Sequence, residues 1–308
     1  MSGAYTSLEE LITFAPAGKR IPLYNPQAAT ATMAGNYRSR IRGRGMNFED
    51  FRPYQSGDDV RAIDWKVSAR TGQTYTRVYR EERERPVLLV LDQGPRLFFG
   101  SQLNFKSVTA IEAMALFAWS ALYHGDRVGA LISGAEHREF KPQHAHGHVL
   151  QLLHAAVQMN HSLKAGLQQD HTLQDQMLAI SSRLVHPGSL VIVVSDFHDI
   201  TAQGLEQMSR IARHNDLVLV QVCDPFDREL PPPGRLFVSN GQQHAVLDSA
   251  DRRCRQQYRQ QAEQRQLRLT EHLTSWNIPL RSLSCGQPTI KQLLRSPRFV
   301  EQPDLGVS

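Results

Sequence analysis

The stretch "VLLVLDQGPRLFFGS", residues 87–101, decides the fold class of this chain. Its first five residues are apolar without interruption, which is typical of a strand buried on both faces of a parallel sheet. The strand ends on Asp92. In an open α/β sheet, ligands bind beside the carboxyl ends of the strands. Asp92 is therefore a candidate catalytic or metal-binding residue.

After this strand, strand-like and helix-like segments alternate. Further strands are predicted at residues 127–133, 136–142, 190–195, 217–223 and 278–284. Helical spacing is found at residues 106–123, 148–159, 173–184, 202–214, 252–276 and 289–296. This alternation predicts an α/β fold with a doubly wound, mostly parallel sheet. The prolines and the strand-like pieces "RLFVS" and "HAVLD" predict a β-hairpin insertion at about residues 224–250.

The segments around the sheet differ in character, and they divide the chain into parts. Residues 1–35 form an N-terminal extension, in which "SLEELITFA" predicts a short helix with Ser7 as its cap and Glu10 completing a capping box. Residues 36–85 are predicted to form a β-rich subdomain, with a strand at "QTYTRVYREE". Residues 86–295 carry the sheet, and residues 296–308 form a C-terminal tail.

The composition is that of an ordinary globular protein. Of 308 residues, 41% are apolar and 21% are charged, and the formal net charge is +5. No apolar run is as long as a membrane span, and the N-terminus lacks the basic-then-apolar pattern of a signal sequence. The three cysteines are far apart, as expected for reduced thiols. We therefore expect a cytoplasmic protein without an integral membrane segment.

Three of the predicted strands deliver an acid to the same edge of the sheet, namely Asp92, Asp196 and Asp224. Carboxylates that converge there would suit a hard cation such as Mg²⁺, which takes oxygen ligands. Alternatively, such acids cap the loops that follow the strands or pair with nearby arginines. The residue types alone leave both interpretations open.

The order of a strand ending on Asp92, a helix, a strand, and a strand ending on Asp196 resembles a von Willebrand factor A-type domain. In that family a metal site is built from an Asp-x-Ser-x-Ser loop, a Thr from a later loop and a further Asp. Asp92 and Asp196 match the two acids, but Gly94 and Arg96 occupy the serine positions. The segment "FKPQHAHGH" contains no Thr. The resemblance thus implies a degenerate metal site without a cofactor, in which Arg96 pairs with Asp92 or Asp196.

The segments "FRPYQSGDDVRAIDWKVSAR" and "YREERERPVLLVLD" are similar to the signature of the bacterial domain of unknown function fifty-eight family. The residues that carry this likeness are Arg52, Tyr54, Gly57, Asp58, Arg61, Asp64, Trp65, Ala69 and Arg70. Members of the family have a von Willebrand A-like domain and are associated with MoxR-type AAA+ ATPases. The resemblance covers about residues 36–250 and implies an accessory or adaptor protein.

Within this motif, Gly57 permits a tight turn whose backbone amides Asp58 can bind. Arg61 and Asp64 can pair with Asp59 or Arg70 and so fix an extended segment. Tyr54 and Trp65 offer apolar faces that would either anchor the subdomain onto the sheet domain or contact a partner.

Other features of the sequence give only weak evidence for metal binding, nucleic-acid binding or catalysis. In "HAHGH", His144, His146 and His148 alternate, so an extended segment would place three imidazoles on one side for Zn²⁺, although loop histidines are more often solvated. The arginine-rich tracts at residues 38–45 and 251–268 lack a nucleic-acid motif, so nucleic acid is not an expected partner. The chain also lacks a G-x-S-x-G elbow and a P-loop.

These observations lead to one functional prediction and one alternative. We expect a non-enzymatic adaptor that works with a MoxR-type AAA+ ATPase in the assembly, maturation or activation of a client protein. The alternative is a metal-dependent enzyme that uses Asp92, Asp196 and Asp224 to hold Mg²⁺ or Mn²⁺.

Overall fold

The computed structural model of the chain describes residues 3–21, 23, 46–54, 60, 63–81, 84–168, 170–239 and 244–295. The chain divides into two compact units. One consists of Met1–Ala28 together with Arg85–Ser308, and the other consists of Ala29–Glu84. The smaller unit is thus an insertion in the sequence of the larger one.

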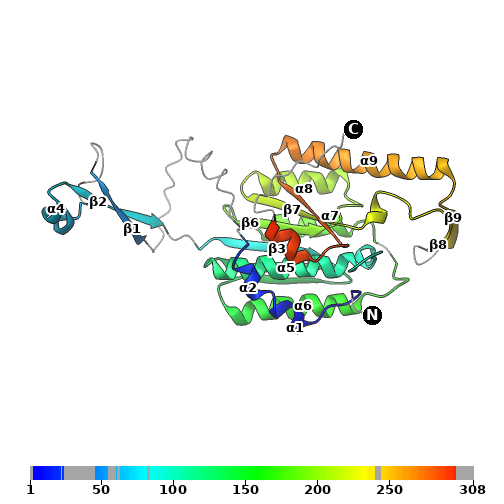
Figure 1. The fold of residues 1–308 in the computed structure, drawn as a ribbon, viewed down its shortest axis with the longest axis horizontal. Coiled ribbons are helices and arrows are strands. Elements are labelled where there is room, and N and C mark those ends of the chain that lie inside the picture. The colour runs from blue at the N-terminus through cyan, green and yellow to red at the C-terminus, as the bar shows by residue number, and fades with distance from the viewer. Residues whose placement is uncertain are drawn as a thin grey trace. The chain divides into compact units, whose positions relative to one another are not determined.

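The larger unit is built on a six-stranded sheet (Figure 1). Its strands are β3 (Pro86–Asp92), β4 (Arg127–Ser133), β5 (His137–Gln143), β6 (Leu190–Ser195), β7 (Asp216–Cys223) and β10 (Leu280–Ser284). They follow the order β10-β7-β6-β3-β4-β5, and all neighbours are parallel except β4 and β5. The prediction of a mostly parallel α/β sheet is therefore confirmed.

The strand order locates the functional edge. Counted along the chain from β5 across the sheet, the six strands run 3-2-1-4-5-6, which is a doubly wound order. The direction of winding reverses between β3 and β6, because the chain first adds strands on one side of β3 and then on the other. Crevices for ligands form at this switch point, beside the carboxyl ends of the strands. Asp92 ends β3 and Asp196 follows β6, so both acids lie at the switch point.

Helices cover both faces of the sheet. The helices of the larger unit are α1 (Leu8–Ile12), α2 (Ala15–Gly18), α5 (Lys106–Tyr123), α6 (His146–Ser162), α7 (Leu173–Leu184), α8 (Ala202–Ala212), α9 (Arg252–Ser275) and α10 (Thr289–Arg295). Alternate residues of β3 point to opposite faces: Leu89 and Leu91 pack with α5 and α6, whereas Leu88 and Val90 pack with α7, α8 and α9. Figure 1 shows α8 and α9 on one side of the sheet and α5 and α6 on the other.

The N-terminal helices are part of the larger unit. Ser7 and Glu10 form the predicted capping box at the start of α1. The Trp119 indole on α5 donates to the carbonyl oxygen of Leu11 at 2.9 Å, and the Ser120 hydroxyl donates to that of Ile21 at 2.5 Å. These bonds satisfy polar groups that would otherwise be buried without a partner.

The smaller unit contains an antiparallel pair, β1 (Met46–Pro53) and β2 (Tyr75–Glu81), and the helix α4 (Trp65–Thr71). The predicted strand at residues 73–82 is confirmed by β2, whereas α4 was not predicted. Its seven residues are too few to show a helical period, but its caps are clear. Asp64 caps its start, and Gly72 ends it with a left-handed backbone, φ 73°.

The predicted hairpin insertion is confirmed by β8 (Arg235–Ser239) and β9 (His244–Asp248), which pair antiparallel. Two short 3-10 helices follow strand ends at the functional edge, η2 (Pro95–Leu97) after β3 and η3 (Pro225–Asp227) after β7. No helix among the described residues combines the length and the apolar character needed to cross a membrane.

Candidate functional site at the carboxyl edge of the sheet

Asp92 lies at the centre of a buried network of hydrogen bonds. Its Oδ1 accepts a bond from the Gly94 amide at 2.8 Å, and its Oδ2 accepts bonds from the Ser195 hydroxyl at 2.6 Å and the Gln174 amide at 3.3 Å. The side chain is therefore fixed by three donors from β6, α7 and its own loop. This network closes the carboxyl end of β3.

Asp196 belongs to the same network. Its Oδ1 accepts bonds from the Gln174 side-chain amide at 2.8 Å and from the backbone amide of His198 at 3.1 Å. Gln174 thus links both acids, and its own Oε1 accepts a bond from the Asp199 amide at 3.1 Å. Gln174 on α7 thus connects the carboxyl ends of β3 and β6.

A buried lysine pairs with the other oxygen of Asp196. The Lys106 Nζ lies 2.8 Å from Asp196 Oδ2 and 3.2 Å from Asp227 Oδ1, and only 3% of the lysine side chain is exposed. Lys106 is the first residue of α5, and Asp227 ends η3. Neither residue is among the predicted site residues. The available signal was a lysine that opens an otherwise apolar helix of 18 residues, at the end where the helix dipole disfavours a cation.

Arg96 lies on the outer side of this cluster. Its Nε is 3.7 Å from Asp196 Oδ2 and 3.7 Å from an oxygen of Asp199. Of the two acids named as its partners, Asp196 is the one within ion-pair distance. At Gly94, an added Cβ would lie 2.6 Å from a terminal methyl of Leu173, so a larger residue would require that leucine to turn.

The third predicted acid, Asp224, does not join the network around Asp92. Its Oδ1 accepts bonds from the amide of Phe226 at 2.9 Å and from the hydroxyl of Ser101 at 2.7 Å, while its Oδ2 accepts one from the amide of Ser101 at 2.7 Å. Asp224 is the N-cap of η3 and ties that turn to the loop after η2. Loop capping, one of the two interpretations that the residue types left open, describes its contacts.

Burial and charge shift the pKa values of the two central carboxyls in opposite directions. Burial, reinforced by the charge of Asp196, raises the pKa of Asp92 to about 6. Burial acts in the same direction on Asp196, but the Lys106 ammonium, the Arg96 guanidinium and the His198 amide together outweigh it and lower the pKa of Asp196 to about 2. Burial would lower the pKa of Lys106, yet Asp196 and Asp227 together raise it above its ordinary value. The ion pair is therefore fully charged at neutral pH.

The groups around Asp92 and Asp196 do not suit the binding of a divalent cation. Asp92 and Asp196 already accept N–H and O–H bonds, and an ammonium group occupies the space between Asp196 and Asp227. Mg²⁺ requires several oxygen ligands at about 2.0–2.1 Å. Within the described residues, no group of three or more His, Cys, Asp or Glu side chains is arranged to hold a metal ion. The hollow beside Asp92 measures about 10 Å³, close to the space that one water molecule needs.

The residues of the family motif are described only in part. Gly57, Asp58 and Arg61 lie outside the described residues. Arg52 lies in β1 opposite Thr76, and the Tyr54 amide donates to the carbonyl oxygen of Thr74 at 2.8 Å.

Two further motif residues begin α4, and a third lies in its last turn. The Asp64 carboxylate accepts bonds from the amides of Lys66 and Val67, both at 3.0 Å, so it caps the start of α4. Trp65, the first residue of α4, has 67% of its surface exposed. Arg70, in the last turn, is also exposed.

His144, His146 and His148 do not line one side of an extended segment, because α6 begins at His146. His146 and His148 are separated by about 200° on a helix, since each residue turns it by about 100°. The His146 ring packs on Trp119 at 5.0 Å between centroids, and the His148 ring packs on Phe140 at 6.2 Å. His144 precedes the helix, with Nε2 3.3 Å from the carbonyl oxygen of Leu122. The imidazoles therefore diverge.

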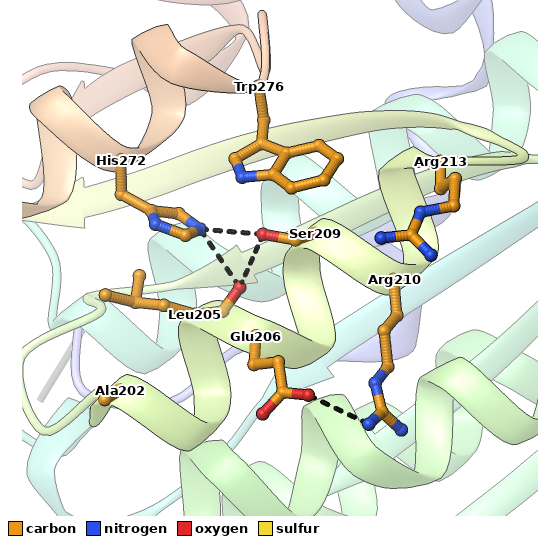
Figure 2. A pocket seen from close by; sticks show the side chains of 8 residues that line it. All are labelled: Ala202, Leu205, Glu206, Ser209, Arg210, Arg213, His272 and Trp276. Atoms are coloured by element: carbon orange, nitrogen blue, oxygen red, sulfur yellow. Dashed lines mark hydrogen bonds and ion pairs between the residues drawn. The ribbon is translucent and has the colours of Figure 1, made fainter.

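A groove of about 530 Å³ lies between α8 and α9 (Figure 2). Its polar groups bond largely to one another: Arg210 pairs with Glu206 at 2.9 Å, and His272 lies 3.0 Å from the Ser209 hydroxyl. The Arg213 guanidinium lies 5.9 Å from the centre of the Trp276 ring. Arg213 precedes β7 and Trp276 precedes β10, so this end of the groove lies toward the amino ends of the strands, away from Asp92.

The strand order and the cluster at the switch point define a doubly wound α/β domain with a closed polar edge. The chain belongs to the family described as Protein of unknown function DUF58, whose model matches residues 50–268. The family resemblance carried by the residue 51–70 motif is thereby confirmed.

Two relatives illustrate the range of sequence similarity. An uncharacterized protein of Mycobacterium tuberculosis is 26% identical over 283 residues, which cover 91% of this chain and 88% of that protein. The uncharacterized protein YeaD of Bacillus subtilis is 33% identical over 107 residues, covering 34% of this chain and 25% of YeaD.

Solved structures show a more distant likeness. An aerotolerance-related membrane protein from Bacteroides fragilis is similar at a TM-score of 0.41 and 11% identity, covering 68% of this chain and 94% of that one. The SpRpn10 VWA domain is similar at a TM-score of 0.38 and 10% identity, covering 70% of this chain and 96% of that one.

Proposed function

We propose that this chain is a non-enzymatic, cytoplasmic adaptor that contacts its partner through the carboxyl edge of the sheet. One observation carries the proposal: the edge where a doubly wound fold binds its ligand is filled by the chain's own side chains. The hollow beside Asp92 has room for about one water molecule, whereas pockets for small molecules measure about 300–1,000 Å³. Such an edge suits recognition of a surface better than conversion of a substrate.

Exposed apolar residues next to the closed network supply a surface for such contact. In the loop between β3 and α5, Phe99 and Leu103 are 43% and 49% exposed. The Phe99 ring lies 6.4 Å from that of Phe226, which belongs to η3. Apolar side chains that cluster on the surface beside charged groups are typical of protein–protein contacts. Arg96, three residues before Phe99 in the same loop, supplies a positive charge next to Asp196.

For the partner, we propose a MoxR-type AAA+ ATPase, with the chain acting in the assembly, maturation or activation of a client protein. Support comes from the motif at residues 51–70, whose family is associated with such ATPases, and from the lack of a P-loop in this sequence. An adaptor without its own nucleotide site would sense the nucleotide state of the ATPase through a difference in affinity for its conformations.

Affinity capture from the cell of origin tests both the partner and the surface. The tagged chain is incubated with ATP or with a slowly hydrolysed analogue, and co-purifying proteins are identified by mass spectrometry. We expect a AAA+ ATPase to be enriched under at least one condition, and Phe99→Glu combined with Leu103→Glu to reduce its recovery about tenfold or more.

Leu267→Glu is the matched control, because Leu267 is 57% exposed but lies on α9. Its recovery of the ATPase should equal that of the unmodified chain. If no AAA+ ATPase is recovered with either nucleotide, the proposed partner is wrong. If the double variant recovers the ATPase as well as the control does, the proposed surface is wrong.

A further inference from the structure

Lys106 occupies a position that is unfavourable for a lysine on three counts. Its side chain is buried, and transfer of an ammonium group from water into the protein interior is costly. It begins α5, where the helix dipole is already positive. The Arg96 guanidinium, which approaches the same Asp196 oxygen at 3.7 Å, adds a further positive charge. A cation is stable in such a place only if the surrounding groups are arranged for one.

The surrounding groups are so arranged. Oxygens from Asp196, after β6, and from Asp227, in the turn after β7, lie 2.8 Å and 3.2 Å from the ammonium nitrogen. The Gln174 amide ties Asp196 to Asp92, and a second Asp227 oxygen accepts the amide of Asp224 at 2.8 Å. Each carboxylate that faces the cation is therefore held from behind by an N–H donor.

We propose that the Lys106 ammonium is a built-in cation that takes the place of a bound divalent metal at the switch point. It joins the ends of β6 and β7 to the start of α5 by charge-assisted hydrogen bonds, as a metal would by coordination. The separations of 2.8 Å and 3.2 Å suit N–H···O bonds and exceed the 2.0–2.1 Å of Mg²⁺–oxygen bonds. This inference concerns only Lys106 and its carboxylates, so it does not depend on the identity of the partner.

The inference predicts that removing the ammonium creates a metal site. In Lys106→Ser, Asp196 and Asp227 would face the space that the ammonium vacates, with the Arg96 guanidinium as the positive charge that remains near Asp196. The serine hydroxyl would add an oxygen ligand. We expect Mn²⁺ to bind this variant with one site per chain, at least about tenfold more tightly than it binds the unmodified protein, by calorimetry and electron paramagnetic resonance. Mn²⁺ should also raise the melting temperature of the variant alone, since a ligand of the native state stabilises it.

Two matched controls define the site. Lys106→Ser combined with Asp196→Asn should lose the gained Mn²⁺ binding, because a ligand oxygen and its charge are removed. Lys291→Ser removes a lysine from α10, which is not part of the cluster, and should gain nothing. If Lys106→Ser does not fold alone, it is refolded with millimolar Mg²⁺ or with propylammonium, which replaces the lost group. Recovery in either supports the inference.

Three outcomes would overturn it. The first is stoichiometric Mn²⁺ binding by the unmodified protein that Asp196→Asn abolishes, because the carboxylates would then hold a metal despite Lys106. The second is a folded Lys106→Ser variant with the Mn²⁺ affinity of the unmodified protein. The third is an unfolded Lys106→Ser variant that neither Mg²⁺ nor propylammonium recovers.

Discussion

At the scale of single residues, two aspartates at neighbouring strand ends behave as different chemical groups. Asp196 pairs with a buried ammonium and stays ionised, with a pKa of about 2. The described residues that donate directly to Asp92 are neutral, and burial together with the charge of Asp196 raises the pKa of Asp92 to about 6. Within one network, Asp196 is thus the ionised partner of Lys106, and Asp92 is the acid that titrates.

This difference has a measurable effect on stability. A carboxyl whose folded pKa exceeds its unfolded value of 3.8 binds a proton more tightly in the folded state, so its contribution to stability falls as the pH rises from about 4 to about 6. At about 1.4 kcal/mol per pKa unit, Asp92 contributes a loss of about 3 kcal/mol across this window. Asp92→Asn should therefore gain stability relative to the unmodified protein as the pH rises.

Urea unfolding at several pH values between about 4 and 8 measures this difference, and comparing variants removes the contributions of other titrating groups. His198 makes the comparison necessary: burial lowers its pKa to about 4, so its own contribution to stability rises with pH over an overlapping window. Glu263→Gln on the exposed face of α9 is the control and should change little at any pH. A stability difference for Asp92→Asn that does not vary with pH would contradict the assignment.

The strand-end acids and the nearby Arg96 could be recognised in the sequence, but Lys106 and Gln174 could not. Asp92 and Asp196 are recognisable because each follows an apolar run, which is a local pattern. Lys106 lies 90 residues from Asp196, and Gln174 lies 82 residues from Asp92. Such contacts depend on how the strands are ordered in the sheet. A sequence can show that a lysine opens an apolar helix, but not which acid it meets.

At the scale of elements, the docking of α2 on α5 depends on a glycine. A Cβ added at Gly18 would lie 2.6 Å from the Trp119 Cβ and 3.0 Å from the Ser120 backbone nitrogen. Neither neighbour is the end of a flexible side chain, so a larger residue at position 18 would force the two helices apart. The close contact at Gly18 allows the Trp119 and Ser120 hydrogen bonds to the N-terminal segment.

Gly18→Ala should loosen this docking and lower the free energy of unfolding by about 1–3 kcal/mol, as overpacking does. Limited proteolysis should also cut the N-terminal segment faster, because its backbone would open more often. Gly147→Ala is the matched control: this glycine lies in the first turn of α6 with nothing within 4 Å of an added Cβ. It should be neutral or slightly stabilising. Equal destabilisation by both changes would show that packing at Gly18 is not the cause.

The elements predicted best from the sequence are the strands that are buried on both faces of the sheet. The buried strands β3, β6 and β7 are nearly continuous apolar runs, and each was located within a residue or so of its observed bounds. Helix α4 was missed because its identity depends on caps at Asp64 and Gly72 and not on an apolar stripe. The start of α6 was predicted at His148 and lies at His146, because alternation over five residues does not distinguish an extended segment from the first turn of a helix.

At the scale of the whole molecule, the described residues of the two units differ in how much apolar surface they bury. The larger unit has two apolar clusters, one on each face of its sheet. In the smaller unit, β1 and β2 form a two-stranded sheet, and α4 has no buried residue. Isolated two-stranded sheets are marginally stable in water. Cooperative protection should therefore be much greater in the larger unit.

Native-state hydrogen exchange tests this expectation. The amides of β2 should exchange by local opening, with a free energy at least about 2 kcal/mol below that of β3 and β6, whose exchange requires global unfolding. The pairing of β4 with β5 provides an internal reference, because β5 is an edge strand of the larger sheet. Equal protection in β2 and β6 would mean that the two units unfold together.

The docking of the N-terminal helices also imposes an order on events during synthesis. Thr6 bonds to Asn160 and His161, and Tyr5 bonds to Leu163, so these contacts span more than 150 positions of the chain. A ribosome adds about 5–20 residues per second, which separates the two sides of each contact by roughly 10–30 s. For that interval Tyr5 and Thr6 lack these partners, while the inserted unit and then α5 emerge. The N-terminal segment can thus complete its contacts only after α6 has been synthesised.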